Sequence, residues 1–301
     1  MPCQEHHRIS VCVLTLNEGF NIAKCLTSLT TQSTDVWVID SQSTDQTEAI
    51  AVQYGAKVLV HNCFDWASQR NWALDNASFE NEWVLFIDAD EEMTPECWAE
   101  VTLKVSRAPA DVHAFKILTS LRFLGARIPH AYNHPPVVRL VRRTKVRWQG
   151  VGAREYAKVT GTAGTISSRL PHEDLRGLKY WLTKHIKNAE REAKHELAPS
   201  IGAVDYSTVT KGQRLRLFLR TRIWIHLPPV PRSVMYFIYR YVLCGGFLDG
   251  RPGFYFCFLH GLWYPIVIAA LEDEQRIAAR LVPADERAIS AASPARDEDP
   301  N

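Results

Sequence analysis

Four short apolar runs alternate with helix-like stretches over the first hundred residues, and they constrain the fold more than any other feature. The runs span 9–16, 36–40, 57–61 and 83–88. Near-continuous apolar runs of this length are typical of strands that are buried on both faces. Helical character is seen in the segments 19–31, 45–54, 66–77 and 95–107. This order predicts an α/β fold with a mostly parallel sheet, right-handed crossovers and flanking helices.

The rest of the chain changes in character twice. Shorter strands are expected at 114–124, 137–143 and 156–170, and a polar helix from about Asp174 to Leu197. Residues 213–271 mix basic and aromatic side chains and then become almost wholly apolar, and the end after Pro283 is charged and alanine-rich. We therefore expect an α/β domain over 1–205, a helical region over 206–280 and a disordered tail over 281–301.

Composition excludes several classes of protein. With 46% hydrophobic residues among 301, the chain can bury a sizeable core, and its net charge of +2 indicates no particular partner. The seven cysteines form no C-x-x-C pair, so we expect free thiols and no zinc site. The first ten residues, MPCQEHHRIS, include no apolar segment, so no secretory signal is expected.

Polar side chains gather where three of the predicted strands end. The stretch VLFIDADEEMTP (84–95) runs from apolar residues into Asp88, Asp90 and Glu91. The first strand ends in 15–18 and the second in 40–45, both rich in acids, amides and hydroxyls. Because ligands of open α/β sheets bind outside the carboxyl ends of the strands, these residues are expected to share one crevice.

The oxygen ligands of Asp88 and Asp90 suit a hard divalent cation such as Mg²⁺ or Mn²⁺, shared with substrate phosphates. If the segment is extended, the two carboxylates lie on the same side of it. A metal there would relieve their mutual repulsion and stabilise a leaving nucleoside diphosphate. An ordinary solvated turn is the alternative for an isolated D-x-D, and the matching polar strand ends favour the metal site.

The N-terminal segments resemble the family 2 glycosyltransferases of the GT-A fold. The resemblance is carried by VLTLNEGFNIAKCLTSL, VIDSQSTDQTEAIAVQYGAKV, ASQRNWALDNA and WVLFIDADEEMTPE, in order and spacing. Together with GFLDGRPGF (246–254), they are most similar to the bacterial lipopolysaccharide-core beta-glucosyltransferase subgroup, a hexosyltransferase type. The resemblance implies that residues 1–205 are the catalytic domain. One departure is Gly19, where the subgroup often has a second glutamate.

The resemblance also implies roles for individual residues. Asp40 would recognise the base, uracil in this interpretation, and Asp90 would hold the metal. Asp88 would contact the ribose or the metal. Other contacts with the nucleotide-sugar would come from Thr15, Asn17, Glu18, Ser43, Gln69 and Arg70. His172 would be a further metal or phosphate ligand, with a purely structural histidine as the alternative. Arg139 would contact acceptor or phosphate, unless it is an ordinary surface arginine.

Inverting transfer needs a base that removes the proton of the attacking hydroxyl. The subgroup's V-H-E element aligns with GVGAREY, so Glu155 matches the acid, while Arg154 replaces the histidine. This substitution leaves Glu91 and Asp174 open as alternative catalytic residues. A surface acid paired with Arg154 is the structural alternative for Glu155.

Residues 211–251 combine eight Lys and Arg with one acid, and aromatic residues lie between them. This mixture favours an anionic membrane surface, with a helical subdomain or dimer contact as the alternative. The run 254–271 is close to spanning length, but Gly261 and Pro265 interrupt it, so we expect it to lie in the membrane plane or re-enter it. No nucleic-acid motif accompanies the charges.

These features predict a metal-dependent inverting glycosyltransferase at the cytoplasmic face of the inner membrane. It would move a sugar from a UDP-sugar to a lipid-linked glycan or lipopolysaccharide-core acceptor. A nucleotidyltransferase of related fold is one alternative, although TLNEGFN lacks its glycine-rich basic signature. A catalytically silent binding or scaffold protein is the other, and the acids at 40, 88 and 90 count against it.

Overall fold

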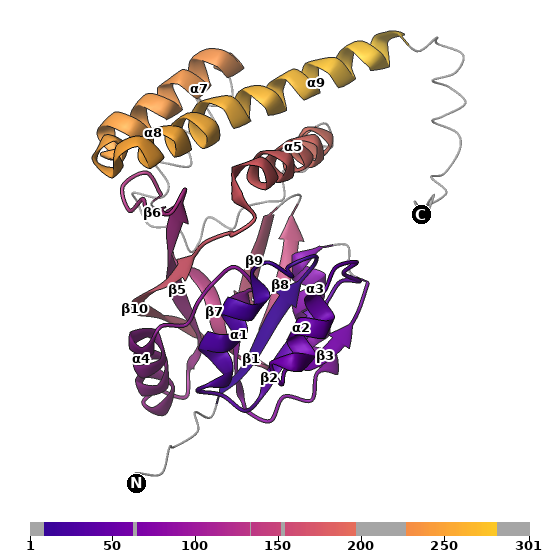
Figure 1. The fold of residues 1–301 in the computed structure, drawn as a ribbon, viewed down its shortest axis with the longest axis vertical. Coiled ribbons are helices and arrows are strands. Elements are labelled where there is room, and N and C mark those ends of the chain that lie inside the picture. Colours follow the sequence, from indigo (N-terminus) through magenta and orange to yellow (C-terminus); the bar gives the residue numbers. More distant parts are fainter. Residues whose placement is uncertain (1–8, 63–64, 133, 152–153, 197–226, 282–301) are drawn as a thin grey trace.

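The computed structural model describes residues 9–62, 65–132, 134–151, 154–196 and 227–281. An α/β body carries the sheet, and a layer of helices lies over one end of it (Figure 1). The predicted boundary at residue 205 and nearly all of the predicted tail fall outside the described residues. The domain limits therefore stay predictions.

Within the described chain, seven strands lie side by side in the order β10-β5-β7-β4-β1-β2-β3, and β6 pairs with β5. Their bounds are β1 Ile9–Thr15, β2 Val36–Asp40, β3 Lys57–Val60, β4 Trp83–Asp88, β5 Val112–Phe123, β6 Ala126–Arg127, β7 Val137–Arg142 and β10 Thr162–His172. As predicted, β1 pairs in parallel with β2 and β4, and β2 pairs in parallel with β3. β7 runs antiparallel between β4 and β5, so the sheet is mixed.

Four helices occupy the predicted positions between the parallel strands. They are α1 Ile22–Thr30, α2 Thr47–Gln53, α3 Trp66–Asn76 and α4 Pro95–Ser106. α4 begins at the predicted residue, because Thr94 Oγ1 accepts a hydrogen bond from Cys97 N at 3.2 Å and Pro95 occupies the first turn.

β1 shows why this sheet needs helices on both faces. All of its residues are buried, and they alternate between two apolar clusters. Val11 and Val13 belong to the cluster that includes α1 and α4. Cys12 and Leu14 belong to the other, with α3 and Trp148. The mixed sheet between these two layers is the architecture of the predicted GT-A fold.

The segment 146–172 differs from the prediction. In place of one strand over 156–170, the structure has β9 (Arg154–Val159) and then β10. β8 (Val146–Val151), which was not predicted, pairs with β9 in a separate two-stranded sheet. The break falls at Gly161, where a Cβ would lie 2.3 Å from the carbonyl oxygen of Asp111. The missing side chain lets the chain turn close against the start of β5.

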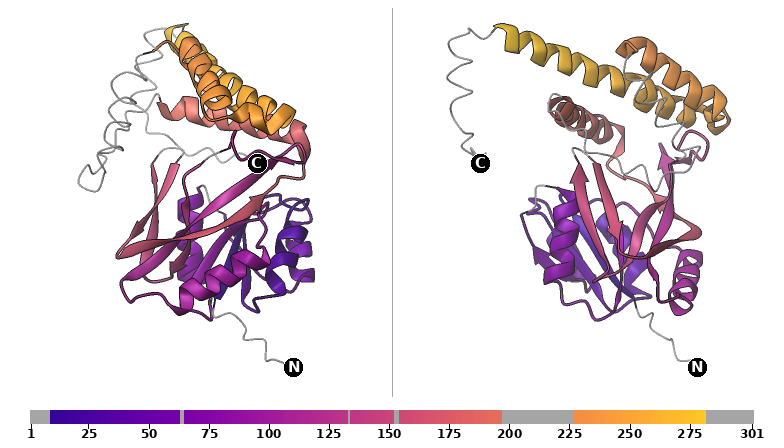
Figure 2. Two further views of the ribbon diagram at one scale, coloured as in Figure 1. Left: turned by 90° about the vertical axis from the view of Figure 1, so that its left-hand side faces the viewer. Right: turned by 180° about the vertical axis from the view of Figure 1, so that it is seen from behind.

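After β10, α5 (Gly177–Glu196) leads to the described C-terminal helices, which form a hairpin above it (Figure 2). The first arm is α7 (Pro229–Ile238) with a π-helical turn, Tyr239–Leu243. The second arm contains a 3₁₀ turn (Gly246–Asp249), α8 (Gly250–Phe258), a π-helical turn (Leu259–Trp263) and α9 (Tyr264–Leu281). Gly245, with φ of 77°, reverses the chain between the arms.

The hairpin is attached to the α/β body by an apolar cluster and a buried polar clamp. The cluster includes Phe123, Ile128 and Phe256. In the clamp, Asp249 Oδ2 accepts hydrogen bonds from the backbone of residues 130 and 131 at 3.0 and 2.7 Å. Arg240 donates to the carbonyl oxygen of residue 131. The GFLDG segment thus fixes the hairpin to the loop that follows β6.

Candidate functional site

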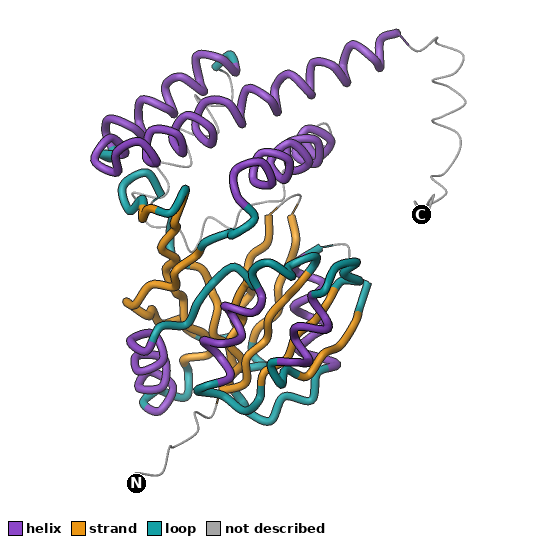
Figure 3. Tube along the Cα trace, viewed as in Figure 1, coloured by secondary structure: helices purple, strands orange, loops and turns teal. Residues whose placement is uncertain are grey.

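Side-chain hydrogen bonds join the loops that follow β1 and β2. Ser43 Oγ accepts from Asn17 N at 2.7 Å, and Asn17 Oδ1 accepts from Thr44 N at 2.8 Å. Asn17 has a φ of 55°, in the left-handed region that asparagine adopts more readily than most residues. The predicted nucleotide-binding residues Asn17 and Ser43 therefore lie together, in loops at one edge of the sheet (Figure 3).

The structure also explains why this loop has a glycine at position 19. Its N–H donates to Asp45 Oδ2 at 3.0 Å. A Cβ at this position would also lie 3.0 Å from the same oxygen. A glutamate at position 19, as in the resembled subgroup, would need Asp45 to move.

Asp40 is fully buried at the end of β2. Its Oδ1 accepts hydrogen bonds from Thr15 Oγ1 and Ser43 Oγ, both at 2.6 Å, and its Oδ2 accepts one from Ser43 N at 2.6 Å. A carboxylate oxygen can accept two hydrogen bonds, so Oδ2 can still accept one more. The role of Asp40 in recognising a base stays a prediction.

Gln69 forms hydrogen bonds with the end of β2. It is buried, and its Nε2 donates to the Ile39 carbonyl at 2.9 Å and to Ser41 Oγ at 2.7 Å. Both hydrogens of the amide are therefore used within the protein. A contact between Gln69 and a nucleotide would have to involve its amide oxygen.

The acids after β4 lie in a turn. Glu91 N donates to the Asp88 carbonyl at 2.9 Å, and β4 ends at Asp88. The expectation of an extended segment with both aspartates on one side is therefore wrong. The turn still leaves both carboxylates at one edge of the sheet, Asp88 with its side chain 36% exposed and Asp90 with its side chain 9% exposed.

Arg139 of β7 holds this turn from inside the protein. Its Nη2 lies 2.7 Å from Asp88 Oδ2 and 2.8 Å from Glu91 Oε1, while Glu91 Oε2 accepts from Asp88 N at 2.9 Å. Burial opposes the charge on Asp88, but the guanidinium of Arg139 outweighs it and holds the pKa of Asp88 well below its usual range. Glu91 is wholly enclosed, which disfavours its predicted alternative role as a base.

Arg70 of α3 links this turn to Glu155. Its Nη2 lies 3.6 Å from Asp88 Oδ1, and its Nη1 forms an ion pair with Glu155 Oε1. The side chain of Glu155 is 32% exposed, so it can meet a ligand. Its partner is Arg70, from a different element than the predicted Arg154, whose side chain is outside the described set.

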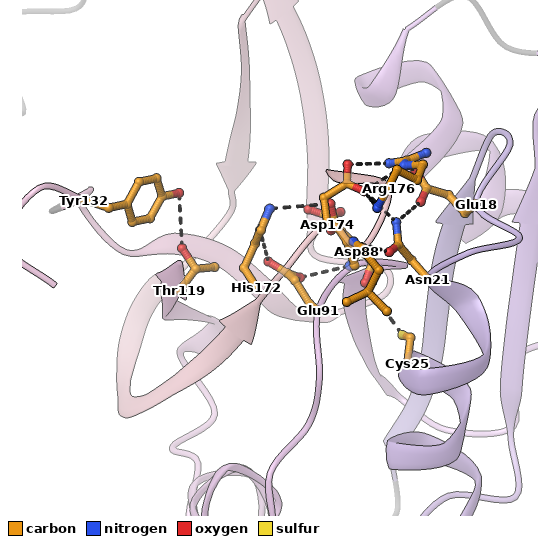
Figure 4. Close-up of polar contacts among 12 residues, drawn as sticks. Glu18, Asn21, Cys25, Asp88, Glu91, Thr119, Tyr132, His172, Asp174 and Arg176 are labelled. Carbon is orange, nitrogen blue, oxygen red and sulfur yellow. Dashed lines mark hydrogen bonds and ion pairs between the residues drawn. The ribbon is translucent and has the colours of Figure 1, made fainter. Parts of the chain in front are cut away.

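His172, the last residue of β10, faces the acids of the turn. Its Nε2 lies 3.4 Å from Asp90 Oδ2 and its Nδ1 3.8 Å from Glu91 Oε1 (Figure 4). Burial by itself would lower the pKa of His172, but the neighbouring carboxylates of Asp90 and Glu91 outweigh it and raise the pKa to about 9. In the metal-free protein, His172 is therefore a cation at neutral pH.

Arg176 is a site residue that the sequence argument missed. It donates to Asp174 from Nε and Nη2, both at 2.7 Å, to the Asn17 carbonyl at 2.9 Å and to Glu18 Oε1 at 3.1 Å (Figure 4). Asn21 joins the same group, because its Nδ2 donates to Glu18 Oε2 at 2.8 Å. The signal was present in the sequence, as charged residues directly after a strand, in the segment HEDLRG.

These contacts also bear on Asp174 as an alternative base. Burial would raise the pKa of Asp174, but the hydrogen bonds and charge of Arg176 outweigh it and lower the pKa. Burial raises the pKa of the nearby Glu18. A carboxylate held by a bidentate arginine is a weak proton acceptor, so Asp174 fits a structural role better.

A cavity of about 330 Å³ opens beside Asp90 and His172. Its other walls come from the turn 121–125, the segment 173–178 and the residues of α5 that face them. None of the predicted nucleotide-binding residues of β1 and β2 borders it.

The acids of the turn after β4 are the candidate ligands of the predicted divalent cation. Among the described residues, no group of three or more His, Cys, Asp and Glu side chains is placed so that it could hold a metal ion. The two aspartates supply hard oxygen donors at the sheet edge, and His172 is 3.4 Å from one of them. Mg²⁺ commonly uses one or two carboxylates and completes its shell with water and substrate phosphates, so this set fits it.

Comparison with known proteins identifies the first half of the chain. Residues 10–152 match the family described as Glycosyl transferase family 2. This part of the chain is therefore similar to a glycosyl transferase family 2 domain. An uncharacterized glycosyltransferase from Rickettsia felis is 40% identical over 94 residues, which cover 31% of this chain and 32% of that protein. One from Rickettsia prowazekii is 32% identical over 126 residues, 42% of each chain.

The chain spans about a third of the length of the first of these relatives. A similar structure is glucosyl-3-phosphoglycerate synthase from Mycobacterium tuberculosis, determined with Mn²⁺, uridine diphosphate and glucosyl-3-phosphoglycerate. It is 23% identical to this chain, with a TM-score of 0.33, and the match covers 38% of this chain and 44% of that one.

The charge of His172 gives a prediction for the metal-free protein. Its pKa is about 9 when folded and about 6.5 when unfolded, so its stabilising effect is complete below about pH 6.5 and is lost as pH rises through about 9. Relative to His172→Gln, wild type should lose about 1–3 kcal/mol of unfolding free energy between these values. Urea unfolding across this range with chelator present measures the difference, and a pH-independent difference would contradict it.

Proposed function

We propose that this protein transfers a sugar from a UDP-sugar to a lipid-linked glycan or lipopolysaccharide-core acceptor, as an inverting, metal-dependent hexosyltransferase. One observation carries the proposal: the acidic turn after β4 meets the loops after β1 and β2 at one sheet edge, inside a glycosyl transferase family 2 domain. The proposed acceptor class rests on the apolar C-terminal hairpin.

In this proposal the chain's own residues divide the work. The loops that contain Thr15, Asn17 and Ser43 bind the nucleotide, and Arg70 approaches its phosphates. Asp88 and Asp90 would hold Mg²⁺ or Mn²⁺, with His172 as a further ligand once its proton is displaced. The bound cation would stabilise the negative charge of the departing diphosphate.

Glu155 is the proposed base because it is more accessible than the other candidates. Glu91 is enclosed by Arg139 and the backbone of the turn, and Asp174 is held by Arg176. Glu155 is partly exposed and lies across Arg70 from Asp88. It would accept the proton of the acceptor hydroxyl as that hydroxyl attacks the anomeric carbon.

Two alternative functions can be distinguished from this one by the products that they would form. A nucleotidyltransferase would release pyrophosphate in place of UDP, and the family match counts against it. A silent binding protein would bind the nucleotide without hydrolysing a UDP-sugar. Neither has a structural observation in its favour.

The C-terminal hairpin supports a location at the membrane. Within the described residues, one helical segment, Gly246–Ala278, could cross a membrane by length and composition, with a mean hydropathy of 1.7 and 17% of its most apolar window buried. Exposed large apolar side chains also line the first arm and the turn, with Leu243 at 75% and Leu248 at 63% exposure. Since α9 carries Glu272 and Asp273, we propose that the hairpin lies in the plane of the cytoplasmic leaflet.

The metal role is tested with Asp90→Asn. In a panel of UDP-sugars with Mn²⁺ or Mg²⁺, the slow hydrolysis that wild type shows without acceptor should fall at least about 100-fold, because the leaving diphosphate loses its cation. Calorimetry should show weaker Mn²⁺-dependent binding of UDP. The control is Asp75→Asn, an exposed acid on α3 that pairs with Arg147. Full hydrolysis by wild type in excess EDTA would contradict the metal role.

The base is tested with Glu155→Gln. Transfer to acceptor in a membrane extract should fall about 10²–10⁴-fold, because a glutamine cannot take the proton, while UDP binding persists. Asp174→Asn is the matched comparison from the same charged region. A small effect at Glu155 and a large one at Asp174 would move the role to Asp174.

The membrane role is tested with Leu243→Glu/Leu248→Glu in the full chain. Wild type should float with anionic vesicles and be partly released by high salt, because salt screens the charges but not the apolar contacts. The double variant should stay with the soluble fraction, since each leucine loses about 1.5–3 kcal/mol of burial. Leu103→Glu, an exposed leucine on α4, is the control. Wild type that does not float would contradict the proposal.

A further inference from the structure

The cavity beside Asp90 is positioned for a second substrate. Asp90 and His172, where the proposed cation would be held, line it together with residues 121–125 and residues of α5. The nucleotide loops after β1 and β2 are not among its walls. A molecule in this cavity would therefore approach the reacting centre from a different side than the nucleotide.

The walls combine an aromatic surface with a hydrogen-bond acceptor. Phe123 and Trp181 contribute rings, and the Trp181 ring stacks on His185 at 3.5 Å between centroids. His185 Nδ1 lies 2.8 Å from the Trp181 carbonyl, so this nitrogen carries the hydrogen. Burial lowers the pKa of His185, and the neutral ring then offers Nε2 as an acceptor. Apolar rings with a few polar groups suit the C–H faces and hydroxyls of a sugar.

The cavity also has cations that the protein leaves weakly paired. The acids on its walls have partners: Asp174 pairs with Arg176 at 2.7 Å, and Asp90 faces His172 at 3.4 Å. Arg122 is 3.8 Å from Glu173, a long ion pair. Within the described residues, Lys184 has no direct ion pair, although its charge acts on Glu18.

Lys184 is also near the apolar hairpin. The next residue on α5, His185, contacts the rings of His260 and Tyr264, at 6.1 and 5.3 Å between centroids. An anion bound at Lys184 would therefore be held by a helix that lines the cavity and also contacts the helices that we propose contact the membrane. This is where the phosphate of a lipid-linked acceptor would be expected.

We propose that this cavity is the acceptor subsite and that it binds a sugar bearing an anionic group, with the sugar against Trp181 and the anion at Lys184 and Arg122. This deepens the proposed function and rests on it. The reacting hydroxyl of the acceptor would lie near Asp90, next to the donor sugar.

The test uses three probes in saturation-transfer NMR with the full chain: glucose 1-phosphate, glucuronate and methyl glucoside. Wild type should bind the two anionic sugars more tightly than methyl glucoside, and the comparison between them shows whether phosphate or carboxylate is preferred. Lys184→Met and Arg122→Met should each weaken binding of the preferred anionic sugar about tenfold, through loss of a charge-assisted hydrogen bond. Lys187→Met, an exposed lysine on the same helix, is the control and should bind as wild type does.

Calorimetry of UDP and UDP-glucose on the same variants separates the two substrates. Their affinities should be unchanged in Lys184→Met and Arg122→Met. The proposal is overturned if no probe binds, if charge makes no difference, if Lys184→Met equals Lys187→Met, or if the variants weaken UDP-glucose instead. Failure of wild type to bind UDP, with sugar binding intact, would overturn the proposed function and leave an anionic-sugar site in place.

Discussion

The site depends on one buried ion pair, between Arg139 and the acids of the turn after β4. Three like charges in a short turn would repel one another and open it, and Arg139 neutralises two of them from β7. Breaking a pair of this kind leaves an uncompensated buried charge and typically costs about 3–5 kcal/mol. Only Nη2 of the guanidinium makes these bonds; Nε and Nη1 are buried without a partner in the described part of the chain. The pair thus gives the turn its shape at some cost in unsatisfied hydrogen bonds.

The position of β7 explains how this pair arises. β7 runs antiparallel beside β4, so a side chain from its middle can reach the end of β4. Arg70 approaches the same aspartate from α3. Asp88 therefore lies between two guanidiniums, whereas Asp90, two residues further, faces His172 and the cavity. Two aspartates that are separated by one residue are thus given different surroundings, although both are at the sheet edge where the proposed cation would be held.

The sequence predicted what depends on local patterns. The strands that end at residues 15, 40 and 88 follow from runs of buried residues, and the start of α4 follows from Thr94 and Pro95.

The sequence did not predict the pairing that depends on distant residues. From the sequence alone, Arg139 could be an ordinary surface arginine or a ligand contact, because no local sequence pattern shows that β7 inserts beside β4. Gln69 aligned with a nucleotide-binding block, but its side chain is used by β2. β9 and β10 were predicted as one strand because Gly161, which separates them, looks like any strand glycine until its contact with Asp111 is seen.

The C-terminal hairpin is connected to the site by the same kind of interaction. Arg240 is buried, and the side chain of Asp249 is only 3% exposed. Both bind the backbone of the loop after β6. This loop follows residues 121–125, which form one wall of the cavity. Buried polar contacts of this kind specify one arrangement, because a small shift would leave several groups without partners. The apolar surface of the hairpin and the cavity are therefore held at a fixed separation. If that surface lies in a membrane, the cavity stands at a fixed height above it, which is a requirement for an enzyme whose acceptor is anchored in the lipid.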